Sequence, residues 1–365
     1  MLRSTSVKQE SWKPVKLLAK QPVKDKILSL ECDLEGKIAV ALTSTSMNIF
    51  NDRELLNVVD IDGGYELKIS SDLEKIFVLS SKKLFCFDYW GNLKWDYVSD
   101  GLIDDFELDP LGKNIVLRGE KFVVFLNRFG DLEWDYNFLE YIIGMYYTTG
   151  GAFLISTTNQ IYSLSSKNEF DKILEIPGQV KTFFSDDGGI SVNDKNLISF
   201  SLTGHHIWQK DLADVRRIRY SNDSLKNYYV EDNKKLVCQD RNGDELWTYS
   251  SADDLQNFNV VNSGMMTGLY SSSYFHVLDE NGEQAWSYYA RERVVDFSFS
   301  TFGGDVVIAS ENKIHWFQNE GFLRNQVNLN LENIESLISK VSFYESNIGD
   351  LEDNFTLVSE QSGGN

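Results

Sequence analysis

Short runs in which apolar residues recur at every second position make up most of the chain, and clusters of Gly, Asp and Asn separate these runs. The run Phe297-Ser-Phe299 is one example. Alternation with a period of two is typical of a β-strand that buries one face, and Gly, Asp and Asn supply the tight turns between strands. The clearest unit predicts four strands, over residues 103–108, 114–117, 121–126 and 132–136. The pattern therefore predicts an all-β protein built from four-stranded units.

A turn glycine followed four residues later by a tryptophan repeats along the chain. The pairs are Gly91 with Trp95, Gly130 with Trp134, Gly204 with Trp208, Gly243 with Trp247, and Gly282 with Trp286. Gly321, Phe322 and Leu323 mark a further copy in which Asn325 replaces the tryptophan, and degenerate copies lie near Asp52 and Asn168. Neighbouring copies are about 39 residues apart, so eight units fit from Asp52 to Gly321.

These units predict the overall architecture. An isolated four-stranded sheet leaves both faces uncovered, whereas eight sheets around an axis bury each face against a neighbour. Four strands per repeat, repeated radially, define a β-propeller blade. We therefore expect residues 23–328 to form an eight-bladed β-propeller. Each of the five tryptophans then lies on the outermost strand of its blade, where a flat indole can pack against the next blade.

The D-x-x-G-x-x-x-W pattern, as in Asp88-Tyr-Trp-Gly91-Asn-Leu-Lys-Trp95, resembles the tryptophan-docking motif of the PQQ-like (pyrroloquinoline-quinone-type) eight-bladed propellers. The resemblance covers roughly residues 23–327. That family includes quinoprotein dehydrogenases and non-enzymatic outer-membrane assembly scaffolds. WD40 repeats are the alternative, because Asp follows both Trp95 and Trp134. The WD40 dipeptide, however, ends a third strand, whereas these tryptophans follow a turn glycine.

The resemblance implies the non-enzymatic branch of that family, because its enzymes hold a quinone cofactor beside two adjacent cysteines and a calcium ion bound by carboxylates. No two cysteines are adjacent here, and we expect reduced, buried thiols at Cys32, Cys86 and Cys238. No zinc-site spacing occurs among His205, His206, His276 and His315. Nucleophile, phosphate-loop and calcium-loop motifs are also absent from the sequence. We therefore expect no catalytic site, no cofactor and no metal.

Composition narrows the range of partners. The chain carries 35 basic and 55 acidic residues, a net charge of −20, which repels nucleic-acid phosphate and anionic lipid and favours a basic partner protein. The N-terminal segment lacks the apolar core of a signal peptide, and no run approaches the roughly 18 apolar residues of a membrane span. We expect a cytoplasmic protein that does not enter a membrane, and nucleic-acid binding is disfavoured.

Five arginines are candidates for partner binding, namely Arg216, Arg217, Arg219, Arg291 and Arg293. They fall where the fourth strand of one predicted blade leads to the first strand of the next. These connections surround one mouth of the central channel, a face that commonly receives partners. Arginine offers a planar fork for carboxylate or phosphate. The alternative is that these arginines neutralise nearby acids such as Asp104, Asp105, Asp214 and Asp254.

The two ends differ from the repeats. Residues 1–22 form a basic arm, and residues 1–26 have a net charge of +5. The arm either lies along the acidic propeller, with Trp12 to Leu18 as an edge strand that closes the ring, or contacts nucleic acid or membrane.

Residues 329–359 predict a helical, coiled-coil-like segment, and residues 360–365 a disordered tail. Apolar residues are spaced alternately three and four apart at Ile334, Leu337, Val341, Tyr344, Ile348, Leu351, Phe355 and Val358. This stripe is narrower than that of most globular helices, which favours a partner helix or a second copy of the chain. Packing on its own propeller is the alternative.

These features together predict a non-catalytic protein-protein interaction scaffold. Its propeller would present loop faces to partners, and its C-terminal helix would mediate oligomerisation or docking. Two alternatives stay open. A propeller enzyme or ligand sensor would use the central channel and would show convergent carboxylates or histidines around the axis. A nucleic-acid-associated adaptor would act through the basic N-terminal arm.

Overall fold

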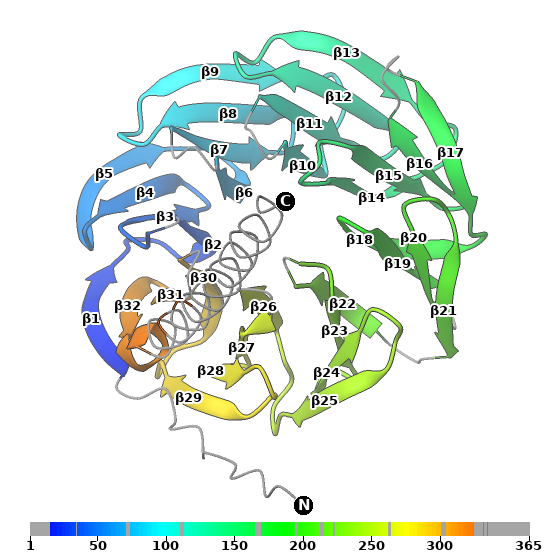
Figure 1. Cartoon of the computed structure of the whole chain (residues 1–365). Helices are drawn as coiled ribbons and strands as arrows, with labels where there is room; N and C mark the ends of the chain where they lie inside the picture. Colours follow the sequence, from blue (N-terminus) through cyan, green and yellow to red (C-terminus); the bar gives the residue numbers. More distant parts are fainter. Residues whose placement is uncertain are drawn as a thin grey trace, which may run out of the picture.

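In the computed structural model the chain forms eight four-stranded antiparallel sheets arranged as blades around a central axis (Figure 1). The structure describes residues 15–33, 35–70, 74–109, 113–164, 169–193, 196–211, 215–221, 223–261, 264–300 and 304–324, together with Leu331 and Ile334. The prediction of an all-β, eight-bladed propeller with four-stranded blades is therefore confirmed.

The strands follow the chain from the innermost to the outermost strand of each blade. Blade 1 contains β2 (Ile27–Cys32), β3 (Ile38–Thr43), β4 (Ser46–Asn51) and β5 (Glu54–Asp60); blade 2 contains β6 (Gly64–Ile69), β7 (Lys75–Ser80), β8 (Lys83–Asp88) and β9 (Leu93–Val98). Blade 3 contains β10 (Asp105–Leu108), β11 (Asn114–Arg118), β12 (Phe122–Asn127) and β13 (Leu132–Asn137); blade 4 contains β14 (Ile142–Tyr147), β15 (Phe153–Thr157), β16 (Gln160–Leu164) and β17 (Phe170–Glu175).

The remaining blades continue in the same order. Blade 5 contains β18 (Gln179–Ser185), β19 (Gly188–Asn193), β20 (Asn196–Ser201) and β21 (His206–Asp211); blade 6 contains β22 (Val215–Tyr220), β23 (Lys226–Glu231), β24 (Lys235–Asp240) and β25 (Glu245–Ser250). Blade 7 contains β26 (Asn257–Val261), β27 (Met266–Tyr270), β28 (Tyr274–Asp279) and β29 (Gln284–Tyr289); blade 8 contains β30 (Val294–Phe299), β31 (Asp305–Ser310), β32 (Lys313–Asn319) and β1 (Val15–Pro22).

Blade 8 takes its outermost strand from the N-terminal end of the chain. Strand β1 pairs antiparallel with β32, with Val15 opposite Asn319 and Pro22 opposite Lys313. The ring is thus closed by an edge strand, one of the two arrangements that the sequence left open for the N-terminal arm. Residues 1–14 of that arm lie outside the described residues.

The copy of the turn motif expected at Gly321 is not a turn between strands. Residues 320–324 form a helical turn instead, and the Phe322 side chain is fully buried. The backbone N–H of Phe322 donates to Asn319 Oδ1 at 3.1 Å, which is the contact of a helix N-cap. Because β1 already occupies the fourth position of blade 8, the chain leaves the sheet after β32.

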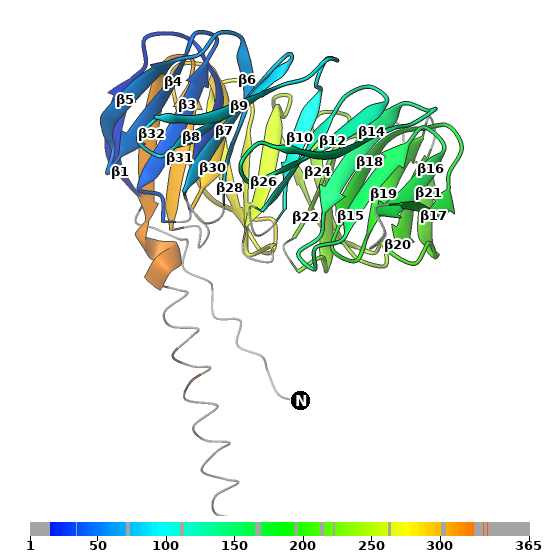
Figure 2. The same ribbon diagram turned by 90° about the horizontal axis from the view of Figure 1, so that it is seen from above.

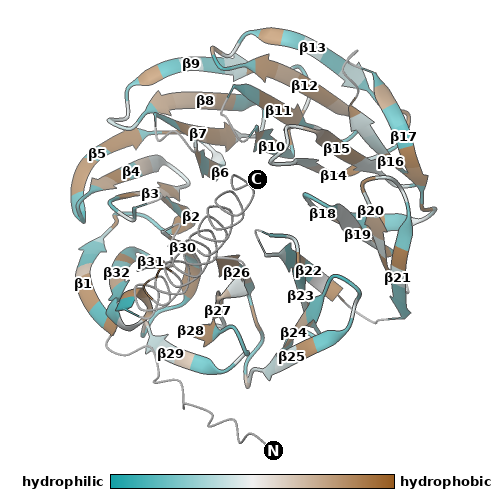
Figure 3. Ribbon diagram, in the orientation of Figure 1, coloured by the Kyte–Doolittle hydropathy of each residue, from teal (hydrophilic) through white to brown (hydrophobic). Residues whose placement is uncertain are grey.

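The hydrophobic core lies between neighbouring blades. In blade 2, for example, β7 and β8 are mostly buried whereas β9 is mostly exposed, and apolar colour is concentrated on such middle strands (Figure 3). Blades 2 and 3 share a cluster that includes Phe77, Leu84 and Phe106. The ring centroids of Phe50 in blade 1 and Trp316 in blade 8 are 5.4 Å apart. Each large apolar side chain buried in this way contributes about 1.5–3 kcal/mol.

Three of the motif tryptophans each form a hydrogen bond to the blade that follows their own. The indole Nε1–H groups of Trp95, Trp208 and Trp247 donate to the carbonyl oxygens of Arg128, Arg241 and Glu280, at 3.2, 3.1 and 2.9 Å. Each acceptor precedes the turn glycine of the following blade by two residues. A Cβ atom on Gly130 would lie 2.5 Å from the Trp95 ring, and Gly130 has a φ of +84°. The turn therefore requires glycine for both its conformation and its contact.

The other two motif tryptophans make different contacts. Trp134 stacks on Phe125 of its own blade at 3.9 Å between ring centroids. Trp286 packs against Phe317 of blade 8 at 5.7 Å, and its Nε1 has no hydrogen-bond partner within the described residues. Neither is followed by a glycine turn between strands, because the copy after Trp134 is degenerate and the copy after Trp286 is the helical turn.

The two faces of the ring carry different connections. The loop face carries the connections from each fourth strand to the next blade, and the turn face carries the first and third turns of each blade. The helical turn at residues 320–324 follows β32 on the turn face (Figure 2).

A β-bulge near the start of the innermost strand recurs in six blades. In β2 the register shifts between Ile27 and Ser29, so that Leu28 is the extra residue. A bulge turns the extra side chain out of the regular alternation. Leu28 is accordingly 43% exposed, whereas Ile27 and Leu30 are buried. In each of these six blades, the bulge therefore places one side chain at the loop-face end of the channel. It also directs alternate residues of the rest of the innermost strand toward the axis.

Candidate functional site

The five candidate arginines are divided between two places. Arg216, Arg217 and Arg219 lie in β22, the innermost strand of blade 6, and not in a connecting loop. The side chain of Arg216 is outside the described residues. Arg291 and Arg293 lie between β29 and β30 and are exposed on the loop face. Because three of the five lie in this innermost strand, the five do not form one loop-face patch. An innermost strand tolerates a run of charged residues where its side chains face the axis.

The acids expected to neutralise these arginines pair with other cations where they are described. Asp104 and Asp105 lie 3.6 and 3.7 Å from the guanidinium nitrogens of Arg118. Asp254 lies 3.9 Å from Lys234 Nζ. Asp214 is outside the described residues.

The predicted coiled-coil segment is described at only two positions. Leu331 and Ile334 are helical and are 52% and 51% exposed. The other candidate positions fall outside the described residues, namely Leu337, Val341, Tyr344, Ile348, Leu351, Phe355 and Val358. Oligomerisation or docking through this helix stays a prediction.

The cysteines are buried, and the histidines lie either in third strands or exposed at the start of a strand. Cys32, Cys86 and Cys238 are buried thiols. His276 and His315 lie in the third strands β28 and β32, and His205 and His206 are exposed at the start of β21. Within the described residues, no group of three or more His, Cys, Asp or Glu side chains could hold a metal ion. No helix in the described part of the chain is long and apolar enough to cross a membrane.

Two alternating positions of each innermost strand surround the channel. The first ring of positions contains Ser29, Glu66, Asp105, Gly144, Lys181, Arg217, Asn257 and Asp296; the second contains Glu31, Lys68, Glu107, Tyr146, Phe183, Arg219, Asn259 and Ser298. Charge is distributed unevenly around these rings. Blades 8, 1, 2 and 3 contribute the carboxylates, and blades 5 and 6 contribute cations. Carboxylates therefore do converge around the axis, which is the feature expected of a channel that binds a ligand.

On the acidic side, Lys68 lies among three carboxylates. Its Nζ is 3.4 Å from Glu66 Oε1, 3.4 Å from Glu107 Oε2 and 3.8 Å from Asp105 Oδ1. Burial raises the pKa of Glu66 to about 7, and burial also raises the pKa of Glu107. Lys68 therefore serves as a shared counter-ion for carboxylates that burial makes less acidic.

Glu31 and Asp296 form a second group of acids on the same side. The backbone N–H of Leu30 donates to Asp296 Oδ2 at 2.9 Å, which joins blade 1 to blade 8. Burial, followed by the charge of Asp296, raises the pKa of Glu31 to about 8. Burial raises the pKa of Asp296 to about 6. Glu31 consequently holds a proton over much of the neutral pH range.

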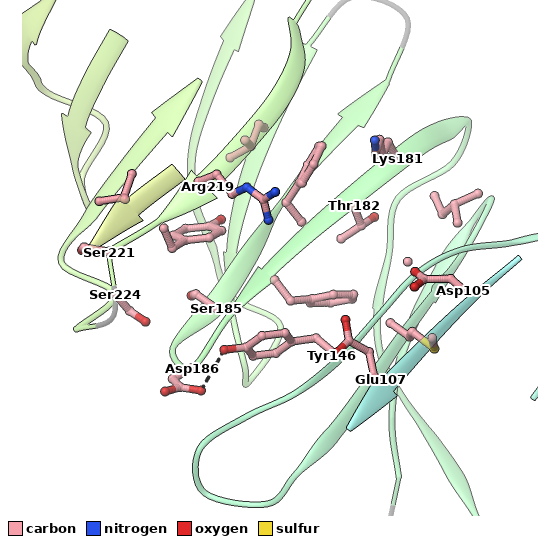
Figure 4. Close-up of a pocket in the computed structure, with 18 of the residues that line it drawn as sticks. Asp105, Glu107, Tyr146, Lys181, Thr182, Ser185, Asp186, Arg219, Ser221 and Ser224 are labelled. Carbon is pink, nitrogen blue, oxygen red and sulfur yellow. Dashed lines mark hydrogen bonds between the residues drawn. The ribbon is translucent and has the colours of Figure 1, made fainter. Parts of the chain in front are cut away.

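The basic side lines a cavity of about 680 Å³ beside the innermost strands of blades 3 to 7 (Figure 4). Arg219 extends into it from β22 and Lys181 from β18, while Asp105 and Glu107 line it from β10. Burial lowers the pKa of Lys181, and the nearby positive charges of Arg217 and Arg219 lower it further. The cations of blades 5 and 6 therefore lie close enough to repel one another.

On the loop face, three apolar side chains are exposed in the two loops that flank blade 3; we call Leu102, Leu139 and Tyr141 the apolar loop patch. Leu139, between β13 and β14, is 95% exposed, and Leu102, between β9 and β10, is 63% exposed. Lys121 Nζ donates to the Leu139 carbonyl oxygen at 3.0 Å and lies 4.5 Å from the centre of the Tyr141 ring.

The two loops of the patch flank one turn. The N–H of Asp104 donates to the carbonyl of Arg118 at 2.7 Å on one side, and the N–H of Phe138 donates to that of Lys121 at 2.7 Å on the other. The turn at residues 119–121 therefore holds both loops on the same face. Exposed apolar side chains from the bulges continue around the mouth at Leu28, Tyr65 and Val180.

Lys181, the apolar loop patch and the channel acids other than Asp105 were not predicted from the sequence. A signal was available, because aligning the repeats at their 39-residue spacing brings Glu31, Lys68, Glu107 and Arg219 to equivalent positions of the first strand. The bulge obscured that signal by shifting the alternation one residue after each strand begins. Leu102 and Leu139 each stand next to a single apolar neighbour, Ile103 and Phe138, so no alternation marks them as exposed.

Comparison with known proteins identifies the fold. No protein-family model matches the chain, and no curated protein matches its sequence. Among solved structures, the chain is similar to the C-terminal WD40 domain of Sif2, with a TM-score of 0.68 and 12% identity, covering 84% of this chain and 98% of that one. It is also similar to BamB from Moraxella catarrhalis, with a TM-score of 0.64 and 11% identity, covering 84% of this chain and 100% of that one. At these identities the likeness shows the eight-bladed propeller fold.

Proposed function

We propose that the protein is a non-catalytic interaction scaffold whose loop face binds a partner protein through the apolar loop patch. The observation that carries the proposal is the exposure of Leu139 and Leu102 on adjacent loops of one face. Burying a leucine side chain contributes about 1.5–3 kcal/mol, so two leucines in water leave that free energy available to a partner. Exposed apolar groups with a polar border mark interaction sites.

The surroundings of the patch indicate the chemistry of the partner. Asp100 and Glu120 are exposed in the loops beside Leu102 and Leu139. The whole chain has a net charge of −20. Complementary charge speeds association and excludes wrong partners. We therefore expect a partner segment in which apolar side chains are accompanied by lysine or arginine.

The two structural neighbours fit this function in a general way. One neighbour is a WD40 domain and the other is BamB, and both are similar in fold to the eight-bladed ring of this chain. Such a ring places many short loops on two faces while the blades stay rigid, and binding residues are often located on loops held by a rigid scaffold. The partner itself is to be identified by experiment.

The proposal is tested with a peptide selected from a random displayed library against the full chain. Binding of that peptide is measured by fluorescence anisotropy for the native protein and for Leu139→Asp. Because the substitution puts a charge where an apolar side chain must be buried, we expect the affinity to fall by about tenfold or more, equivalent to about 1.4 kcal/mol.

The matched control is Phe129→Asp, which changes an exposed apolar residue of the same blade on the turn face. It is expected to leave the affinity of the peptide within about twofold of the native value. Equal affinities for the native protein and Leu139→Asp, or a loss confined to Phe129→Asp, would show that the loop patch is not the binding surface.

A further inference from the structure

We propose that the basic side of the channel binds a small organic anion that carries at least two negative charges, as phosphate or carboxylate groups. The site is independent of the proposed loop-face function. Thr149 and Ser224 lie in the first turns of their blades and Ser185 ends β18, so this part of the cavity lining lies toward the turn face.

Two of the three cations that line this cavity, Lys181 and Arg219, lack carboxylate partners among the described residues. Within the described residues, no carboxylate oxygen lies within the 4.0 Å limit of an ion pair from Lys181 or from Arg219. Lys181 Nζ lies instead 4.9 Å from the centre of the Phe183 ring. Both side chains are exposed to the solvent of the channel, so a bound anion can reach them and form charge-assisted hydrogen bonds. The chain has a net charge of −20, so most of its cations could pair with acids. Neutralisation of nearby acids does not explain Lys181 and Arg219, which have no such pair among the described residues.

The carboxylates of the cavity, in contrast, already have partners. Asp105 pairs with Arg118 and Lys68, and Glu107 pairs with Lys68. Asp186 accepts hydrogen bonds from the N–H and the hydroxyl of Thr149, both at 2.7 Å. The lining carries three carboxylates and three cations, and the two cations without an ion-pair partner among the described residues lie at its Lys181 and Arg219 side.

The cavity also offers hydrogen-bond donors and sufficient space. Lys181 provides an ammonium group with three N–H donors, and Arg219 provides a guanidinium group with five. Arginine adds a planar fork that binds phosphate or carboxylate through two hydrogen bonds. The volume of about 680 Å³ falls within the range of small-molecule sites.

The charge distribution favours a small anion over an acidic polypeptide. A long acidic chain would remain in contact with the negatively charged outer surface, whereas a small ion inside the cavity is screened from that surface by salt over about 8 Å. Glu107 and Asp105 of blade 3 repel an anion and so favour a position beside Lys181 and Arg219 of blades 5 and 6 (Figure 4).

Isothermal titration of the full chain with sodium pyrophosphate and, separately, with sodium citrate tests the proposal, with sodium chloride added to match ionic strength. We expect saturable binding of at least one probe by the native protein. Preference for pyrophosphate or for citrate distinguishes a phosphate ligand from a carboxylate ligand. The double variant Lys181→Gln with Arg219→Gln should weaken binding by about tenfold or more, because two charge-assisted contacts are lost.

Two further variants separate loss of the site from loss of the fold. Arg291→Gln removes an exposed arginine of the loop face and should retain the native affinity. Arg219→Lys keeps the charge but loses the fork, and it should bind with intermediate affinity. The proposal is overturned if neither probe binds saturably to the native protein, or if the double variant or Arg219→Lys binds as tightly as the native chain.

Discussion

His315 lies buried in β32 with a hydroxyl group beside each nitrogen of its ring. Tyr288 Oη is 3.2 Å from Nδ1, and Ser310 Oγ is 3.2 Å from Nε2. Burial lowers the pKa of His315 to about 4, and the nearby positive charges of Lys20 and Lys313 oppose its protonation as well. Glu292 acts in the opposite direction, but its effect is smaller than that of burial and Lys20. The folded chain therefore holds a neutral imidazole at neutral pH.

This residue predicts a loss of stability in mild acid. The unfolded chain takes up a proton at an ordinary histidine pKa of 6.5, whereas the folded chain takes it up only near 4. Stability from His315 is therefore present above pH 6.5 and falls as the pH decreases toward 4. Between pH 7 and pH 4.5 we expect the native protein to lose about 2 kcal/mol more unfolding free energy than His315→Gln, measured by urea denaturation.

His205→Gln is the control for that experiment, because His205 is exposed. It should show the pH dependence of the native protein. If His315→Gln loses as much stability as the native protein over this range, the buried imidazole is not the group responsible.

At the scale of elements, β1 is the strand on which closure of the ring depends. Its residues pair with β32 from Val15 to Pro22, and Leu18 and Ala19 pack against the core between blades 8 and 1. Without β1, the outer edge of β32 would expose unpaired backbone groups, and such edges promote aggregation.

Deletion of residues 1–22 is therefore expected to lower the unfolding temperature by about 10 °C or more and to cause aggregation. Each lost backbone hydrogen bond costs about 1 kcal/mol, and apolar contacts are lost with them. Differential scanning calorimetry and light scattering measure both effects. Deletion of residues 1–14 alone keeps β1 and should lower the unfolding temperature far less. Equal effects of the two deletions would contradict the closure of the ring by β1.

Most strands could be predicted from sequence because the pattern that indicates a strand lies within a few neighbouring residues. Alternation fixes where a strand lies, and the glycine and tryptophan of each repeat fix the spacing of blades. Gly321 was misjudged because the fourth strand of blade 8 comes from the other end of the chain, which no local pattern reveals. Arg216, Arg217 and Arg219 were assigned to a loop because a charged run next to a bulge lacks the alternation of a strand.

At the scale of the whole molecule, the chain separates its charges and its apolar groups into different regions. Lys181 and Arg219, which have no ion-pair partner among the described residues, line the channel, whereas the apolar loop patch lies on the loop face. The candidate sites could not be read from sequence, because each arises where several blades meet. Side chains from different repeats converge only after the ring has closed.

The central claim is that the loop face receives a partner through the apolar loop patch. Hydrogen exchange of the full chain, measured with and without the selected peptide, tests it most directly. The account predicts slower exchange on binding at residues 99–104 and 138–141, and unchanged exchange at the turn-face residues 127–131. Slower exchange confined to the turn face, with the loop residues unchanged, would contradict it.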